Sequence, residues 1–302
     1  MIKKFLLTLL LCLTLIGSAS AQFTFPVNHF SDTSGDIELL SSIVGLEVDC
    51  ELDSTIAAST GTAHQWKNVI TTPDNGDDQT DCDFYLGTSN DGDGAQPTLT
   101  GSGQDQHYSV DGGDYFTSIS LSSATTLANA HKTNGTYWFA LAYRANSPGV
   151  LRPLGSARGV ADVGIMAQME DSSFRRVFQM AEGTLVSTGE TAAANDYTSG
   201  DDILYIQSVD MTTDTGNNTR VWTVTTTSQA FNRTRIATTA SALNNFIIGG
   251  ADKSGVADAI VPSGSNIYAS AHGGQFLTDA LASSIAQIWS TRHNISFLGK
   301  TP

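Results

Sequence analysis

Apolar and polar residues alternate in short runs along most of the chain, and many of the apolar positions are β-branched or aromatic. Such alternation is typical of β-strands, because successive side chains of a strand point to opposite faces. Clusters rich in Gly, Asn, Asp and Pro separate the runs and favour turns. The predicted strands are Phe23–Val27, Gly45–Leu52, Asp83–Leu86, His107–Val110, Tyr115–Leu121, Thr136–Tyr143, Val163–Gln168, Arg175–Met180, Ile203–Val209, Arg220–Thr227, Phe246–Ile248 and Ile267–Ala269. Many short strands joined by turns predict an antiparallel sandwich or barrel.

One later stretch has the periodicity of a helix. Its apolar residues recur three or four positions apart, which predicts a helix over Leu277–Arg292 with Thr278 or Asp279 as its N-cap. The segment Asp36–Val44 fits a helix or a strand equally well. There is no long internal repeat and no clean linker, so the pattern predicts a single compact domain.

The sharpest alternation lies in residues 46–53, which read Leu46-Glu47-Val48-Asp49-Cys50-Glu51-Leu52-Asp53. In a strand, the four apolar side chains would face a core and the four acidic ones would line the opposite face. Two interpretations follow. The acidic row is either the catalytic row of a hydrolase or the solvated face of the opening strand of a binding sandwich.

The N-terminus has the features of a secretory signal peptide. Lys3 and Lys4 precede the apolar run Phe5–Ile16, and the small residues Ala19-Ser20-Ala21 end it. The run is too short to span ~30 Å of hydrocarbon comfortably. We therefore expect a signal peptide at residues 1–21, an N-terminal leader at 22–39, and one domain at 40–302 of a secreted protein.

The charge balance is strongly acidic. The chain of 302 residues has 15 Lys and Arg against 30 Asp and Glu; removal of the signal peptide removes two Lys, which leaves 13 against 30 and a formal charge of −17. Such a surface argues against nucleic acid and anionic membranes as partners. It fits solubility in salty surroundings, or cation binding.

Two cysteines, Cys50 and Cys82, remain after processing. In an exported chain such a pair predicts a disulfide, with two buried thiols as the alternative. The six histidines are scattered singly along the sequence, which favours surface or core positions over a zinc site.

Two acidic loops are the candidate metal sites. They contain Asp74, Asp77 and Asp78 in one loop and Asp91 and Asp93 in the other. Ca²⁺ takes six to eight oxygen ligands and accepts flexible loops of this kind. The alternative is that both segments are polar turns that use Asp and Gly for local geometry.

Several segments, in this order, resemble the concanavalin A-like (laminin-G-like) jelly-roll domains of bacterial and phage proteins. The resemblance covers roughly residues 40–292. It rests on Leu46–Asp53 with Ser54-Thr55-Ile56, Gly61–Asn68, Gln96–Gly101, Val110–Phe116, Tyr137–Tyr143, Phe246–Gly250 and the helix Thr278–Arg292.

This resemblance implies an all-β fold: a two-sheet antiparallel jelly-roll sandwich with a short C-terminal helix and one concave face. It also implies a noncatalytic recognition or adhesion domain with a glycan, or a cell or particle surface, as its partner. We expect no cofactor; because members of the family often hold a structural calcium ion, a structural Ca²⁺ is the alternative.

The motif Glu47-x-Asp49-x-Glu51 also matches laminarinase- and agarase-like retaining glycoside hydrolases, which share this architecture. That likeness would make Glu47 the nucleophile, Asp49 the helper and Glu51 the general acid/base. Retaining chemistry needs two carboxyl groups about 5–5.5 Å apart, which one strand face can provide. However, the motif of those enzymes lies mid-chain between aromatic-rich segments, which are missing here, and the acidic run continues to Asp53. Hydrolysis is therefore the alternative.

A second alternative is a structural subunit of an extracellular assembly, such as a homo-oligomer, in which the leader adds a strand to a neighbouring chain. For glycan binding, exposed aromatic rings serve as stacking platforms. The candidates are Tyr85, Tyr115, Tyr197 and Trp222, whereas the sequence context of Trp66, Trp138 and Trp289 predicts core positions.

Overall fold

The computed structural model has a compact unit at Glu38–Pro302, to which the features below belong. The signal peptide and the predicted strand Phe23–Val27 lie outside the described residues. The structure describes residues 37–56, 64–71, 82–89, 94–119, 135–144, 146, 151–156, 164–169, 175–181, 185–191, 198–213, 218–222, 229–231, 245–253, 256–259 and 261–297.

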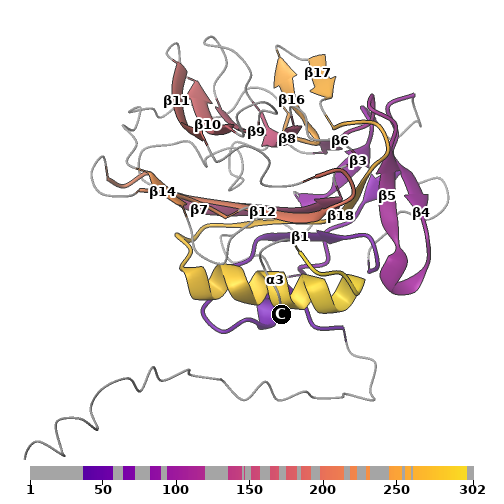
Figure 1. Ribbon diagram of the computed structural model, residues 1–302, viewed down its shortest axis with the longest axis horizontal. Helices are drawn as coiled ribbons and strands as arrows, with labels where there is room; N and C mark the ends of the chain where they lie inside the picture. The colour runs from indigo at the N-terminus through magenta and orange to yellow at the C-terminus, as the bar shows by residue number, and fades with distance from the viewer. Residues whose placement is uncertain are drawn as a thin grey trace, which may run out of the picture. The chain divides into compact units, whose positions relative to one another are not determined.

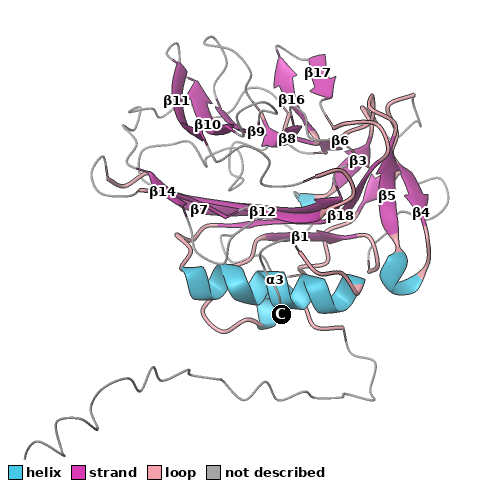
Figure 2. Ribbon diagram, in the orientation of Figure 1, coloured by secondary structure: helices cyan, strands magenta, loops and turns pink. Residues whose placement is uncertain are grey.

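Two antiparallel sheets form the sandwich (Figures 1 and 2). Sheet A has the order β14-β13-β12-β7-β18-β5-β4, and β1 pairs with β18 beside this path. Its strands are β1 (Cys50–Asp53), β4 (Thr98–Thr100), β5 (His107–Val110), β7 (Thr136–Arg144), β12 (Asp202–Asp210), β13 (Thr219–Trp222), β14 (Gln229–Phe231) and β18 (Ser265–Gly273). The predicted two-sheet fold is confirmed.

Sheet B has the order β11-β10-β9-β8-β15-β6-β3-β2. Its strands are β2 (Gln65–Trp66), β3 (Phe84–Leu86), β6 (Phe116–Ser118), β8 (Leu151–Gly155), β9 (Gly164–Met169), β10 (Arg175–Ala181), β11 (Leu185–Thr191) and β15 (Ile247–Ile248). A separate hairpin consists of β16 (Gly250–Lys253) and β17 (Val256–Ala259).

One α-helix, α3 (Asp279–His293), lies against the side of sheet A that faces away from sheet B (Figure 1). Two 3₁₀ turns, η1 (Leu40–Ser42) and η4 (Gly103–Asp105), complete the described helical elements. Within the described residues, no helix combines the length and the apolar character that crossing a bilayer requires.

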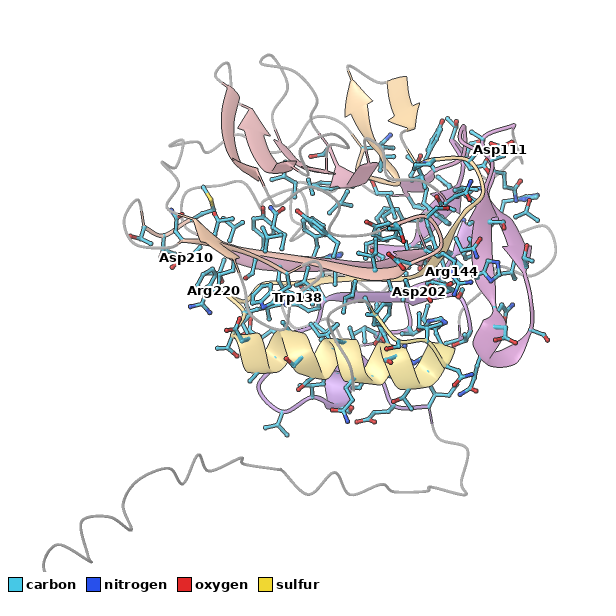
Figure 3. All side chains as sticks on the ribbon, viewed as in Figure 1. Asp111, Trp138, Arg144, Asp202, Asp210 and Arg220 are labelled. Carbon is cyan, nitrogen blue, oxygen red and sulfur yellow. The ribbon has the colours of Figure 1, made fainter. Side chains whose placement is uncertain are left out.

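Sheet A is the central layer because its long strands are apolar on both faces. In β7, Tyr137, Phe139, Leu141 and Tyr143 belong to the core between the sheets. The intervening residues belong to a second core against α3, where Figure 3 shows Trp138 between the sheet and the helix. The other two of these residues, Ala140 and Ala142, are small, so the helix can pack closely on the sheet.

The helix begins and ends where the sequence predicts. Thr278 is the N-cap, and its hydroxyl oxygen accepts a hydrogen bond of 3.3 Å from the amide of Leu281. This bond satisfies one of the amides that a helix start leaves without a partner. At the other end, Asn294 takes the left-handed conformation with φ of 50° and ends the helix. The ambiguous segment Asp36–Val44 contains the short turn η1.

The strand predicted at Gly45–Leu52 begins only at Cys50, which changes the positions of the acidic residues. Leu46 and Val48 pack in the core against α3, whereas Cys50 and Leu52 pack between the sheets. The strand's other face is covered by the helix. The expectation of a solvated acidic face is therefore wrong: Asp49, Glu51 and Asp53 are all fully buried, and only Glu47 is exposed.

Candidate functional site

The carboxylate of Glu51 lies between β1 and α3, and three donors surround it. The amide of Leu40 donates to Oε2 at 2.9 Å, the indole of Trp289 donates to Oε1 at 3.2 Å, and Arg292 Nη1 lies 2.7 Å from Oε1. Burial raises the pKa of Glu51, and the opposing charge of Arg292 offsets only part of this effect.

Asp53 completes the same buried network. Its Oδ2 lies 2.5 Å from Arg292 Nη1 and 3.2 Å from His293 Nε2, and its Oδ1 accepts bonds from the amide and the hydroxyl of Thr55 at 2.8 and 2.7 Å. Burial alone would raise the pKa of Asp53. The bond and charge of His293 and the charge of Arg292 outweigh it and lower the pKa to about 2. The network joins the first strand of sheet A to the last turn of the helix.

The three residues of the glycosidase-like motif do not share an open face. Glu47 is exposed, Asp49 is buried, and Glu51 is enclosed by its ion pair and hydrogen bonds beneath the helix. A hydrolase needs an acid/base and a nucleophile on either side of a bound sugar. This arrangement of the three carboxylates instead favours a structural role for Glu51.

The two cysteines lie buried in the core between the sheets. Cys50 Sγ lies 3.4 Å from the carbonyl oxygen of Cys82, and Cys82 Sγ lies 3.4 Å from that of Asp49. The structure also brings His272 to this pair, with its Nε2 3.7 Å from Cys82 Sγ. Burial raises the pKa of the Cys50 thiol, and the bond to Cys82 adds to this effect.

Sequence reasoning missed His272 as a neighbour of the cysteines, because single histidines carry no spacing signal. It also missed Arg292 and His293 as partners of the acidic strand. The signal that points to them is the pair of basic residues at the end of a helix whose apolar face must pack on the sheet.

A polar and aromatic surface lies at the other end of sheet B from β11. We call it the Tyr115 patch and define it by His64, Tyr85, Thr88, Gln96 and Tyr115. The hydroxyl groups of Tyr115 and Thr88 are 2.6 Å apart, and Gln96 Nε2 is 2.6 Å from His64 Nδ1. Both tyrosines and His64 are partly exposed.

Backbone hydrogen bonds link the patch segments in series, and the side-chain contact between Gln96 and His64 closes the series. The amide of Leu86 donates to the carbonyl oxygen of His64 at 2.8 Å, and the amide of Gly87 donates to that of Tyr115 at 2.8 Å. The amide of Tyr115 donates to the carbonyl oxygen of Ala95 at 3.2 Å. His64 has φ of 40°, which is uncommon for a residue other than glycine and is often found at ligand sites. The sheet thus fixes the positions of the side chains.

Alternation along β3 explains why a tyrosine is available here. Phe84 and Leu86 point into the core between the sheets, so Tyr85 between them lies on the outer face of sheet B. Tyr85 is also the direct cross-strand partner of Gln65 in β2, which adds an amide beside the ring. Tyrosine rings next to amide and hydroxyl groups are the combination that binds sugars by stacking and hydrogen bonds.

The remaining aromatic predictions have mixed outcomes. Trp66, Trp138 and Trp289 are fully buried, as predicted. Trp222 is buried too, and its indole donates to Asp279 at 2.8 Å, so it is no stacking platform. Tyr197 lies outside the described residues.

The predicted calcium ligands also lie outside the described residues, as Asp74, Asp77, Asp78, Asp91 and Asp93. Their loops are attached to described parts of the structure. Residues 90–93 connect Ser89 to Gly94, beside Thr88 and Gln96 of the Tyr115 patch.

Solved structures with a similar fold include the sialidase of Trypanosoma rangeli in complex with 2,3-difluoro-KDN, with a TM-score of 0.50 and 10% identity over 81% of this chain and 33% of that one. The same sialidase with sialic acid has a TM-score of 0.49 and 10% identity, with coverage of 81% and 33%. The binding domain of botulinum neurotoxin serotype D has a TM-score of 0.47 and 8% identity, with coverage of 79% and 50%.

This chain spans about a third of the length of that sialidase. At 10% identity the likeness shows a shared fold alone. No protein-family model matches the sequence, and comparison with curated proteins found no match.

Proposed function

We propose that this protein is a secreted concanavalin A-like jelly-roll domain that recognises glycans without cleaving them, and that the Tyr115 patch is its binding surface. The observation that carries the proposal is the set of backbone and side-chain hydrogen bonds that holds two partly exposed tyrosines close to His64, Thr88 and Gln96. A fixed surface loses little conformational entropy when a ligand binds.

The burial of the acidic strand supports the noncatalytic part of the proposal. The carboxylate of Glu51 is fully buried and paired with Arg292, so a sugar cannot reach it without displacement of the helix. Of the three motif carboxylates only Glu47 is exposed, whereas retaining hydrolysis requires a pair of carboxyl groups beside the sugar.

Calcium has a place in this proposal. The loop that carries Asp91 and Asp93 connects Ser89 to Gly94, close in sequence to Thr88 and Gln96 of the patch. A Ca²⁺ ion held there by oxygen ligands would offer vacant coordination positions to sugar hydroxyls. Glycan binding would then weaken when the ion is removed.

A glycan array tests the proposal when mature protein, residues 22–302, is applied with Ca²⁺ and with a chelator. We expect binding to a restricted set of glycans, weaker in chelator, and no released sugar when the bound glycan is incubated with the protein. Silence across the array would contradict the recognition function. The appearance of new reducing ends would contradict its noncatalytic character and favour the hydrolase.

A further inference from the structure

Three side chains with soft metal-binding atoms meet in the interior, from parts of the chain that are far apart in sequence. They are Cys50 in β1, Cys82 two residues before β3, and His272 in β18. One ligand atom from each lies within 4.8 Å of the other two, and all three residues are buried. The described side chains contain no other such group of three or more His, Cys, Asp or Glu residues.

The backbone fixes this arrangement. Cys50 and His272 are direct partners in the antiparallel β1–β18 pairing, and the amide of Asp49 donates to the carbonyl of His272 at 3.0 Å. Asp83 follows Cys82, and its carboxylate accepts a hydrogen bond of 2.8 Å from the backbone amide of Asn68. The side-chain oxygen of Asn68 in turn accepts a hydrogen bond of 2.9 Å from the backbone amide of Glu51. The cysteine segment is thus tied to β1.

We propose that Cys50, Cys82 and His272 bind a thiol-seeking metal ion, of which Zn²⁺ is the representative. Zinc is held by thiolate sulfur and imidazole nitrogen at about 2.3 and 2.0–2.1 Å, which places tetrahedral ligand atoms about 3.5–3.8 Å apart. The observed 3.7 Å between Cys82 Sγ and His272 Nε2 falls in this range. The carbonyl oxygen of Asp49, 3.4 Å from Cys82 Sγ, lies within reach of a fourth position.

Charge balance favours this ion in a buried place. Binding converts both thiols to thiolates and releases two protons, so a divalent ion and its two thiolates are neutral together, and the histidine stays neutral. A neutral group avoids most of the desolvation cost of a buried charge. Hard cations such as Ca²⁺ prefer oxygen ligands, so this site differs in chemistry from the acidic loops.

A disulfide between Cys50 and Cys82 would use the same two sulfur atoms, so the bridge and the metal exclude each other. The proposal therefore concerns the reduced protein. It is independent of glycan recognition, because the three residues lie inside the sandwich and the Tyr115 patch lies on its surface.

The test is equilibrium dialysis of the reduced full chain against Zn²⁺ and, as a spectroscopic probe, Co²⁺, with Mg²⁺ as the comparison. We expect one equivalent of Zn²⁺ and a thiolate-to-cobalt charge-transfer band, both at least tenfold weaker in Cys82→Ser and His272→Asn. His107→Asn is the matched control: it removes a histidine on β5 and should leave uptake unchanged.

Alkylation of the wild-type protein gives a readout that needs no variant. Zinc should protect both Cys50 and Cys82 from iodoacetamide, as peptide mapping would show. Reduced protein that takes up neither Zn²⁺ nor Co²⁺, or uptake that persists in both variants, would overturn the proposal. So would an intact mass that shows the bridge re-forming in the presence of zinc.

Discussion

Arg292 forms ion pairs with two carboxylates that the fold removes from water. Its side chain is only 7% exposed, and those of Glu51 and Asp53 are fully buried. Removal of one member of a buried ion pair leaves an uncompensated charge. Arg292→Met should therefore reduce the free energy of unfolding by about 3–5 kcal/mol, measured by urea denaturation.

Arg144→Met is the matched control for that change. Arg144 also pairs with an aspartate, Asp202, at 2.7 Å, but its side chain is 42% exposed. Solvent screens such a pair, so its loss should cost about 1 kcal/mol or less. Equal losses of unfolding free energy in the two variants would show that the buried network stabilises the fold no more than an exposed ion pair does.

Asp53 makes the free energy of unfolding depend on pH. The pKa of Asp53 is about 2 in the folded protein and about 3.9 in an unfolded chain. The ionised Asp53 therefore stabilises the fold fully at pH values above about 3.9, and this stabilisation is lost as the pH falls towards 2. Asp53→Asn removes the titration. The stability gap between wild type and this variant should narrow by about 2–3 kcal/mol between about pH 6 and pH 2.

Thermal unfolding at several pH values, followed by circular dichroism, measures this gap. The raised pKa of Glu51 acts in the opposite direction, but it is present in both proteins and cancels to first order. Asp105→Asn, at an exposed position in η4, is the control for loss of a carboxylate outside the buried network. A constant gap for Asp53→Asn would refute the assignment of the low pKa.

Single residues show where sequence reasoning ends. The alternation in residues 46–53 is real, but it does not say whether the acidic face meets water or another layer. Here it meets Arg292 and His293, more than 230 positions away, so the acids are buried rather than solvated. Burial of Trp66, Trp138 and Trp289 was predictable because their neighbours are apolar or strongly patterned.

At the scale of elements, α3 makes sheet A a layer buried on both sides. Ala282 is fully buried in the core against the sheet, whereas Ala280, half a turn earlier, is exposed. Ala282→Leu should cost about 1–3 kcal/mol, because the added carbons have no room between helix and sheet.

Ala280→Leu tests the same chemical change on the outer side of the helix. Its effect should stay within about 0.5 kcal/mol. The melting temperatures of Ala280→Leu and Ala282→Leu, measured in the same buffer, show which face of the helix packs on the sheet. A larger loss for Ala280→Leu than for Ala282→Leu would mean that the helix packs through its other face.

Length alone did not decide which elements were predictable. The nine-residue β18 was predicted only over Ile267–Ala269, and the seven-residue β11 was not predicted. The strands β5, β7, β10 and β12 and the helix match their predicted ranges to within about one or two residues. Strands such as β2, β4 and β14 have only two or three residues, too few to show a period. They exist because a neighbouring strand pairs with them, which is a property of the assembled sheet.

For the whole molecule, the order of layers restricts where a ligand can bind. One face of sheet A packs on sheet B and the other packs on α3, so the acidic strand has no open side (Figure 1). At the β2 end of sheet B, by contrast, Gln65, Tyr85 and Tyr115 are partly exposed. The resemblance to jelly-roll domains predicted the layers but not this surface, because its segments converge only in the fold.

The most direct test of glycan recognition at the Tyr115 patch is the affinity of one array-selected glycan for four proteins, measured by titration calorimetry. Tyr115→Ala and His64→Asn should bind about tenfold or more weakly than wild type, a change of about 1.4 kcal/mol. Asn tolerates the positive φ of position 64, and His107→Asn, on sheet A, should bind as wild type does. Wild-type affinity in both patch variants would contradict the proposal.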